Sequence, residues 1–172
     1  WSSDVCSSDL SLALVLESEG KYVWDKRDPG GETMMGVTRN SWATWLKRPI
    51  QDGEMANLTV ADVTPFYKAI YWDGCKCDDL PLGVDYLVFD FAVNAGCNRA
   101  IKTLQEAIGC VPDGVIGTNT LKCLQEANNK DLIVKFSDAK RTYYKSLKLF
   151  PVFGTGWLNR VDRVQKQAEA MV

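Results

Sequence analysis

Histidine is absent from this chain of 172 residues. Its absence excludes a Ser-His-Asp triad and a Cys-His peptidase mechanism, because both use an imidazole as the base. A catalytic zinc ion ligated by histidine is excluded for the same reason. A hydrolase built from this sequence must therefore work with carboxylates, hydroxyls, thiols, lysines or backbone dipoles.

The sequence also lacks a long apolar run and a strong charge of either sign. No stretch reaches the roughly 18 consecutive apolar residues of a membrane span. The formal net charge is −2, whereas a nucleic-acid-binding surface shows a basic excess. We therefore expect no membrane span in the visible chain and no nucleic-acid partner.

Residues 1–10 differ in character from the rest of the chain. They resemble the in-frame translation of a common sequencing adapter, and we interpret them as an artefact that carries no function. Without Asp4 and Asp9 the chain has 20 acidic and 20 basic residues, so it is nearly neutral. A natural polar tail is the alternative interpretation.

Five cysteines lie outside this segment: Cys75, Cys77, Cys97, Cys110 and Cys123. An odd number argues against a fully paired disulfide framework. One residue separates Cys75 from Cys77, whereas zinc sites typically space such ligands by two or more. We expect buried, reduced thiols; a four-thiolate zinc site that also uses Cys110 and Cys123 is the alternative. We expect no metal and no cofactor.

Hydrophobic periodicity predicts helices along nearly the whole chain. The clearest pattern lies between Val84 and Ala92, where apolar residues recur at helical spacing. Thr59, with Asp62 three residues later, predicts a capping box at the start of another helix. Residues 22–38 are irregular and predict at most a short hairpin. We expect a mainly α fold of about eight helices with one small irregular or hairpin lobe.

Two acidic residues stand out near the start of the chain. An apolar helical stretch, 12–19, ends at Glu19, and Asp28 follows in a turn rich in proline and glycine. Glycoside hydrolysis uses such a pair: one carboxylic acid protonates the leaving oxygen, and the other acts as base, nucleophile or charge stabiliser. The alternatives are a solvated helix-end acid for Glu19 and a turn-shaping role for Asp28.

The chain carries a series of short motifs in a fixed order. They are Glu19-Gly20-Lys21-Tyr22, Asp28-Pro29-Gly30-Gly31-Glu32-Thr33, Gly36-Val37-Thr38, Tyr71-Trp72, Leu80-Pro81, Phe89-Asp90, Val93-Asn94-Ala95-Gly96, Leu104-Gln105-Glu106-Ala107-Ile108-Gly109, Asp113-Gly114-Val115-Ile116-Gly117 and Thr120. Together they resemble the phage-type muramidases of glycoside hydrolase family 108 and the helical peptidoglycan-binding module that usually follows them. The likeness covers essentially everything from Ser11 to the end.

This resemblance implies a lysozyme-like fold whose small lobe lies near the active site. It implies cleavage of the β-1,4 bond between N-acetylmuramic acid and N-acetylglucosamine in bacterial peptidoglycan. The catalytic acid would be Glu19; Glu17 faces another side of the helix. Lys21 departs from the family's motif, which has a glycine there. Residues 11–93 would form the muramidase region and 94–172 the peptidoglycan-binding-like region, packed as one compact body.

Further site residues are expected around Glu19. Asp28 is the candidate second carboxylate, with Asp25 as the alternative, and the Thr33 hydroxyl is a candidate for positioning the attacking water. Sugars stack their apolar faces on aromatic rings and hydrogen-bond to polar groups. Core packing is the alternative for the aromatic rings, and helix capping or termination is the alternative for the polar residues. The expected substrate-binding residues are Tyr22, Trp24, Thr38, Tyr71, Trp72 and Asn94.

The leading functional hypothesis is a phage or prophage endolysin. It would be made in the bacterial host cytoplasm and act as a monomer on the cell wall, in the periplasm. One alternative is a non-catalytic or weakly catalytic peptidoglycan-binding or scaffold domain that keeps the muramidase fold, since fold alone does not determine function. Another is an envelope glycosidase that acts on chitin or chitosan.

Overall fold

The computed structural model describes residues 7–20, 22–24 and 32–172. The chain divides into two compact units, Trp1–Ile70 and Tyr71–Val172. This division falls earlier than the boundary expected after residue 93. Residues 71–93 therefore pack with the C-terminal helices, and each unit is described here by itself.

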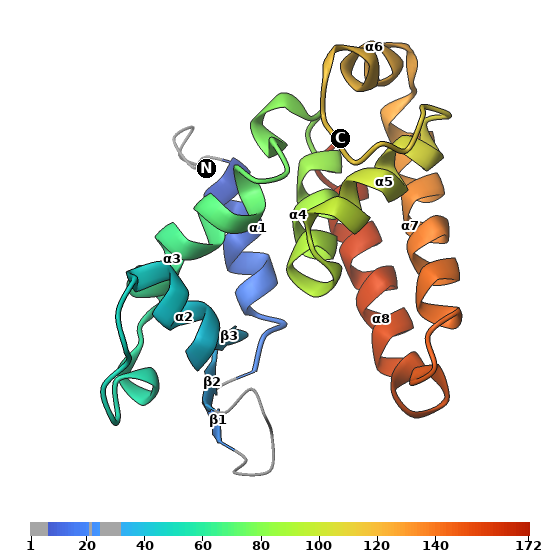
Figure 1. Cartoon of the computed structure of the whole chain (residues 1–172). Coiled ribbons are helices and arrows are strands. Elements are labelled where there is room, and N and C mark those ends of the chain that lie inside the picture. The colour runs from blue at the N-terminus through green and yellow to red at the C-terminus, as the bar shows by residue number, and fades with distance from the viewer. Residues whose placement is uncertain (1–6, 21, 25–31) are drawn as a thin grey trace. The chain divides into compact units, whose positions relative to one another are not determined.

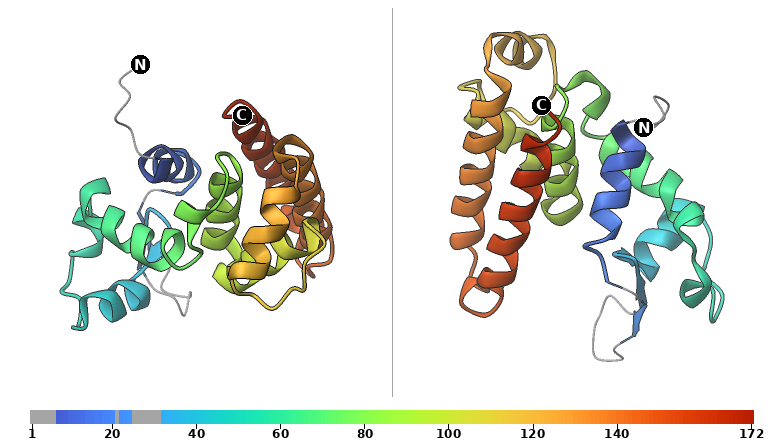
Figure 2. Two further views of the ribbon diagram at one scale, coloured as in Figure 1. Left: turned by 90° about the horizontal axis from the view of Figure 1, so that it is seen from above. Right: turned by 180° about the vertical axis from the view of Figure 1, so that it is seen from behind.

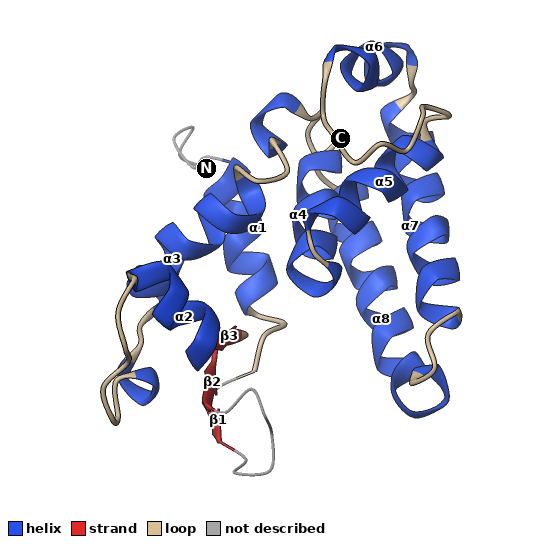
Figure 3. Ribbon diagram, in the orientation of Figure 1, coloured by secondary structure: helices blue, strands red, loops and turns tan. Residues whose placement is uncertain are grey.

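The first unit combines helices with one small sheet (Figure 1). The strands β1, β2 and β3 form an antiparallel sheet in that order, so the predicted hairpin lobe is present. They are the red elements of Figure 3. The elements are α1 (Ser7–Leu16), β1 (Val23–Trp24), β2 (Glu32–Met34), β3 (Val37–Thr38), α2 (Arg39–Leu46), the 3₁₀ helix η1 (Met55–Asn57) and α3 (Val60–Tyr67).

The helix α1 ends earlier than predicted. After Leu16 the chain continues in turns, with the amide of Ser18 bonded to the carbonyl of Val15 at 2.9 Å and that of Glu19 to Leu16 at 3.2 Å. Gly20 has no positive φ, so it does not adopt the left-handed conformation with which a glycine often ends a helix. Glu19 therefore lies in a turn just past the helix.

A two-residue turn joins β2 to β3. Met35 and Gly36 both have positive φ, 46° and 78°. Two consecutive left-handed residues are typical of a type I′ turn, which matches the twist of a tight hairpin. Glycine adopts this conformation without strain, whereas a residue with a side chain does not. The turn thus fixes where β3 and α2 begin.

Side-chain caps define the starts of α2 and α3. The Thr38 hydroxyl accepts a bond from the Ser41 amide at 3.1 Å. Thr59 and Asp62 form the predicted capping box. A π-helical segment, η2 (Lys68–Trp72), follows α3. The core of this unit is aromatic, with the ring of Phe66 packed edge-on against Tyr67 at 5.7 Å.

The second unit is helical. In Figure 2 the long helices α7 and α8 lie side by side in both views, and every residue of α4 from Val84 to Ala92 is buried, which confirms the strongest sequence pattern. The elements are the 3₁₀ helix η3 (Cys77–Asp79), α4 (Val84–Ala95), α5 (Cys97–Ala107), α6 (Thr118–Glu126), α7 (Asn129–Lys145) and α8 (Phe150–Glu169).

A buried ion cluster ties α4, α7 and α8 together. Asp90 on α4 is fully buried and pairs with Lys140 of α7, which is 1% exposed. Its other oxygen accepts two bonds from Arg160 of α8, at 3.0 and 2.8 Å. Burial by itself raises the pKa of Asp90. The attraction of Lys140 and Arg160 lowers it by more than burial raises it, so the pKa lies below its ordinary value. Asp90 is therefore ionised and balances its two cationic partners.

The cysteines only partly follow the expectation. Cys75 and Cys77 are buried free thiols and Cys97 is a half-buried one, whereas Cys110 and Cys123 form a disulfide across 13 residues. The expectation of reduced thiols is thus wrong for this pair, because an odd count still allows one bond.

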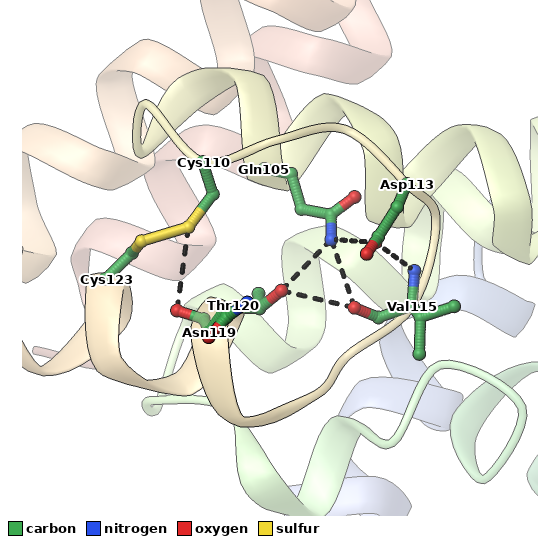
Figure 4. Close-up of a disulfide and its surroundings, with 7 residues drawn as sticks. All are labelled: Gln105, Cys110, Asp113, Val115, Asn119, Thr120 and Cys123. Atoms are coloured by element: carbon green, nitrogen blue, oxygen red, sulfur yellow. Dashed lines mark hydrogen bonds between the residues drawn. A yellow bond between two sulfur atoms is a disulfide. The ribbon is translucent and has the colours of Figure 1, made fainter.

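Beside the disulfide lies a buried amide network (Figure 4). Gln105 donates to Asp113 at 2.7 Å and to Thr120 at 3.0 Å, and its oxygen accepts from the Gly114 amide at 2.8 Å. The network holds the loop between α5 and α6 in place. Within the described residues, none of the helices has the length and apolar character that crossing a membrane requires.

Candidate active site

Glu19 lies against the turn between β2 and β3. A Cβ atom built on Gly36 would sit 2.7 Å from Oε2 of Glu19 and 2.6 Å from the hydroxyl of Tyr67. Real Cβ atoms do not approach so closely, so only glycine leaves room for both groups. The carboxylate of Glu19, the hydroxyl of Tyr67 and the backbone of the turn therefore meet at one point.

Tyr67 holds the turn between β2 and β3 in position. It is 1% exposed, and its hydroxyl donates to the carbonyl of Met35 at 2.7 Å. The close packing of the Tyr67 ring against Phe66 in the aromatic core restricts a change of its rotamer. Glu19, by contrast, is only half-buried. A helix-borne tyrosine thus anchors the turn, and the partly exposed carboxylate rests on that anchored surface.

A second glutamate of the same lobe has a different environment. Glu32 accepts a bond from the Tyr22 hydroxyl at 2.8 Å, and its other oxygen pairs with the guanidinium of Arg39. Arg39 also donates to the carbonyl of Ile50. The hydrogen bonds from Tyr22 and then Arg39 hold the pKa of Glu32 below its ordinary value. Glu32 is therefore an ionised anchor and is poorly suited to donate a proton.

The two candidate threonines are neighbours in the sheet. Thr33 of β2 pairs directly with Thr38 of β3, so their side chains emerge on the same face. The Thr38 hydroxyl caps α2 and lies 2.9 Å from the Ser41 hydroxyl. The capping alternative is thus confirmed for Thr38. The catalytic role of Thr33 stays a prediction.

Some candidates lie outside the described part of the chain. These are Asp28, its alternative Asp25 and the side chain of Trp24, although the backbone of Trp24 forms part of β1. The second carboxylate of the proposed pair therefore stays a prediction from the sequence. Tyr22 is described, and its hydroxyl bond to Glu32 fixes the position of its ring.

Three expected substrate contacts belong to the second unit. Trp72 is 1% exposed and donates from its indole to Asp78 at 2.8 Å. It occupies a core position, which was its alternative role. Tyr71 is half-buried. The exposed Asn94 donates to the carbonyl of Asp90 at 2.6 Å, one turn earlier in α4. Contacts of Tyr71 and Asn94 with a substrate stay predictions.

Two residues of the site escaped the sequence reasoning. Tyr67 follows Val63 and Phe66 at helical spacing, which predicts a core residue rather than a partner of the turn. Arg39 belongs to no motif that the sequence analysis singles out. A usable signal was Gly36, because a glycine between two short β-prone segments indicates a tight turn onto which other side chains can pack.

Comparisons with known proteins place this geometry in a family. The family model described as Glycosyl hydrolase 108 matches residues 12–96. The structure of Brucella abortus SagA is similar to the chain, with 38% sequence identity and a TM-score of 0.86, over 96% of this chain and 95% of that one. The chain belongs to glycoside hydrolase family 108. No curated protein matches it.

Membership confirms the expected family and the mainly α, lysozyme-like fold. It also supports a glycosidase. The matched segment of this family 108 protein contains Glu19, the Met35-Gly36 turn and Tyr67. The point at which these groups meet therefore lies within the segment that defines the family.

Proposed function

We propose that this family 108 protein hydrolyses bacterial peptidoglycan. The bond cleaved is the β-1,4 linkage between N-acetylmuramic acid and N-acetylglucosamine, and Glu19 is the general acid. The observation that carries the proposal is the half-buried Glu19 carboxylate, which rests on the Met35-Gly36 turn beside the Tyr67 hydroxyl. It is supported by the family assignment and by the unsuitability of Glu32 as a proton donor.

In the proposed reaction Glu19 donates its proton to the glycosidic oxygen as the bond to the sugar breaks. General acid catalysis of this kind typically contributes about 10²–10⁴ in rate. Asp28 serves as the second carboxylate, which stabilises or attacks the developing oxocarbenium ion or activates water. Thr33 orients the water, and the rings of Tyr22 and Trp24 contact the sugar.

The biological setting is part of the same proposal. The chain acts as a monomeric endolysin of a phage or prophage, made in the host cytoplasm and directed to the wall. Residues 94–172 contribute binding to peptidoglycan, as the module in related muramidases is expected to do. Residues 1–10 are an artefact without a role in either activity.

The decisive variant is Glu19→Gln, which keeps the size of the side chain but removes its acidic proton. We expect clearing of purified peptidoglycan to fall by at least about 100-fold, at an unchanged melting temperature. Glu17→Gln is the matched control, because Glu17 is exposed and lies on the same short segment. We expect this control to clear peptidoglycan like the wild type.

Mass spectrometry of the released fragments identifies the bond. A muramidase leaves N-acetylmuramic acid at the reducing end. Undiminished clearing by Glu19→Gln would reject the assignment of the acid. A wild-type protein that sediments with peptidoglycan yet releases no fragments would instead support a non-catalytic binding or scaffold role.

A further inference from the structure

The connection between α7 and α8 exposes a cluster of large apolar side chains. Leu149, Val152 and Phe153 are 57%, 71% and 52% exposed. Leu149 lies in the connection that follows α7, and Val152 and Phe153 lie in the first turn of α8; this connection is at the bottom of the view in Figure 1. We call these three residues the α7–α8 tip. Scattered apolar residues are normal on a surface, whereas a contiguous group indicates an interaction site.

The tip is held in place by local packing. The amides of Val152 and Phe153 both donate to the carbonyl of Leu149, at 3.0 and 3.1 Å. The ring of Phe150 lies on Gly154, where an added Cβ atom would come within 2.6 Å of it. Phe150 is half-buried against Gly154, whereas its neighbours Leu149, Val152 and Phe153 are exposed. The exposed side chains therefore belong to an ordered structure.

The charged residues of the chain segment that carries the tip are all positive. Residues 139–161 contain no Asp and no Glu. Lys145 and Lys148 are exposed just before the tip, and within the described part of the chain neither makes an ion pair. The tip thus combines exposed apolar side chains with two unpaired cations.

We propose that the α7–α8 tip docks on the surface of an anionic lipid bilayer. Leu149, Val152 and Phe153 enter the boundary between headgroups and acyl chains, and Lys145 and Lys148 contact lipid phosphates. Apolar side chains flanked by lysines suit this interface, because the apolar side chains leave water while the lysines contact the negatively charged surface. The unpaired lysines and the acid-free segment favour lipid over a protein partner. This inference does not depend on the proposed glycosidase activity.

The test is sedimentation of the full chain with lipid vesicles at low ionic strength. Vesicles of mixed phosphatidylglycerol and phosphatidylcholine should bind the protein, and those of phosphatidylcholine alone should bind it far less. Lys145→Gln with Lys148→Gln should weaken binding to the anionic vesicles by about 30-fold, since each cation near such a surface contributes about fivefold. Val152→Ser with Phe153→Ser should weaken it by at least about tenfold.

Two matched double variants serve as controls. Val111→Ser with Val115→Ser removes side chains that are 78% and 58% exposed elsewhere in the same unit. Lys122→Gln with Lys130→Gln makes the same change in net charge away from the tip. We expect both controls to bind vesicles like the wild type.

Circular dichroism should be unchanged in all four double variants, which shows that each of them is folded. Wild-type protein that stays in the supernatant with anionic vesicles would overturn the proposal. So would tip variants that bind vesicles as the controls do. Tip variants that lose only their sedimentation with peptidoglycan would identify the patch as a wall contact instead.

Discussion

Replacing Gly36 with alanine tests whether the turn positions the carboxylate of Glu19, the proposed general acid. The added methyl group would sit 2.6 Å from the Tyr67 hydroxyl and 2.7 Å from Oε2 of Glu19. Both contacts are too short, so both groups or the turn itself must shift. Tyr67 is buried and rigid, whereas Glu19 is the flexible end of a half-buried side chain. We therefore expect the carboxylate of Glu19 to be displaced in the Gly36→Ala variant.

The size of the effect follows from two separate contributions. Alanine in the left-handed region costs about 1–2 kcal/mol, and φ at Gly36 is 78°. Strain on the bond from Tyr67 to the Met35 carbonyl adds about 1–3 kcal/mol if that bond is lost. For a chain of this length each kcal/mol lowers the melting temperature by about 2–4 °C. A carboxylate displaced by about 1 Å reduces the rate by about 100-fold.

Gly53 provides a matched control for this variant. Its φ is 77°, and nothing lies within 4 Å of the position of an added Cβ atom. Gly53→Ala therefore carries the backbone strain of the left-handed conformation without the steric contact. We expect it to melt a few degrees below the wild type and to clear peptidoglycan at the wild-type rate.

The assay compares thermal unfolding and peptidoglycan clearing for the two variants. If the reasoning is right, Gly36→Ala loses more stability than Gly53→Ala, and only Gly36→Ala loses activity. Equal melting temperatures and equal clearing rates would refute the idea that Gly36 makes room for Glu19. An inactive Gly53→Ala would show that the lobe responds to strain anywhere in it.

Two further variants test contacts that support the fold. Tyr67→Phe removes the donor to the Met35 carbonyl, so we expect a loss of about 1–3 kcal/mol, measured by urea unfolding; stability within error of the wild type would exclude this role. Asp90→Asn leaves Lys140 and Arg160 without their buried counter-charge, so we expect a loss of about 3–5 kcal/mol. A thermal melt at the wild-type temperature would show that the ion cluster contributes little.

Local signals were enough to predict much of the fold. The capping box at Thr59 needs only residues that are adjacent in sequence, and the structure confirms it. The helix from Val84 to Ala92 follows from its apolar pattern, since such a segment must be buried. The end of α1 was predicted less well. Gly20 permits a left-handed helix end but does not require one, because glycine adopts either sign of φ.

The site was harder to predict, because its contacts join residues that are distant in sequence. Tyr67, at the end of α3, meets the turn at Gly36 only in the folded unit, and no local pattern encodes that contact. Trp72 is the converse case: the sequence suggests a substrate-binding residue, and the structure shows a side chain buried in the core. Aromatic character suits both a sugar platform and a hydrophobic core, and only burial distinguishes the two roles.

The bond between Cys110 and Cys123 depends on tertiary structure in the same way. The count of cysteines gave no reason to pair these two. The loop that carries Asp113 folds onto Gln105, and the disulfide closes the same loop from α5 to α6. The pairing therefore becomes visible only once this loop is folded, and the number of cysteines does not reveal it.

The two glutamates of the small lobe separate the structural role from the chemical one. Glu32 has two donors, and one of them is a guanidinium whose charge is permanent, so its proton is lost well below neutral pH. A group in that state cannot protonate a leaving oxygen, but it can hold Tyr22 and Arg39 in place. Glu19 instead rests on the turn beside the Tyr67 hydroxyl, where an added Cβ atom at Gly36 would clash with both groups. The lobe thus anchors itself through Glu32, and Glu19 is the carboxylate to which our proposal assigns the proton transfer.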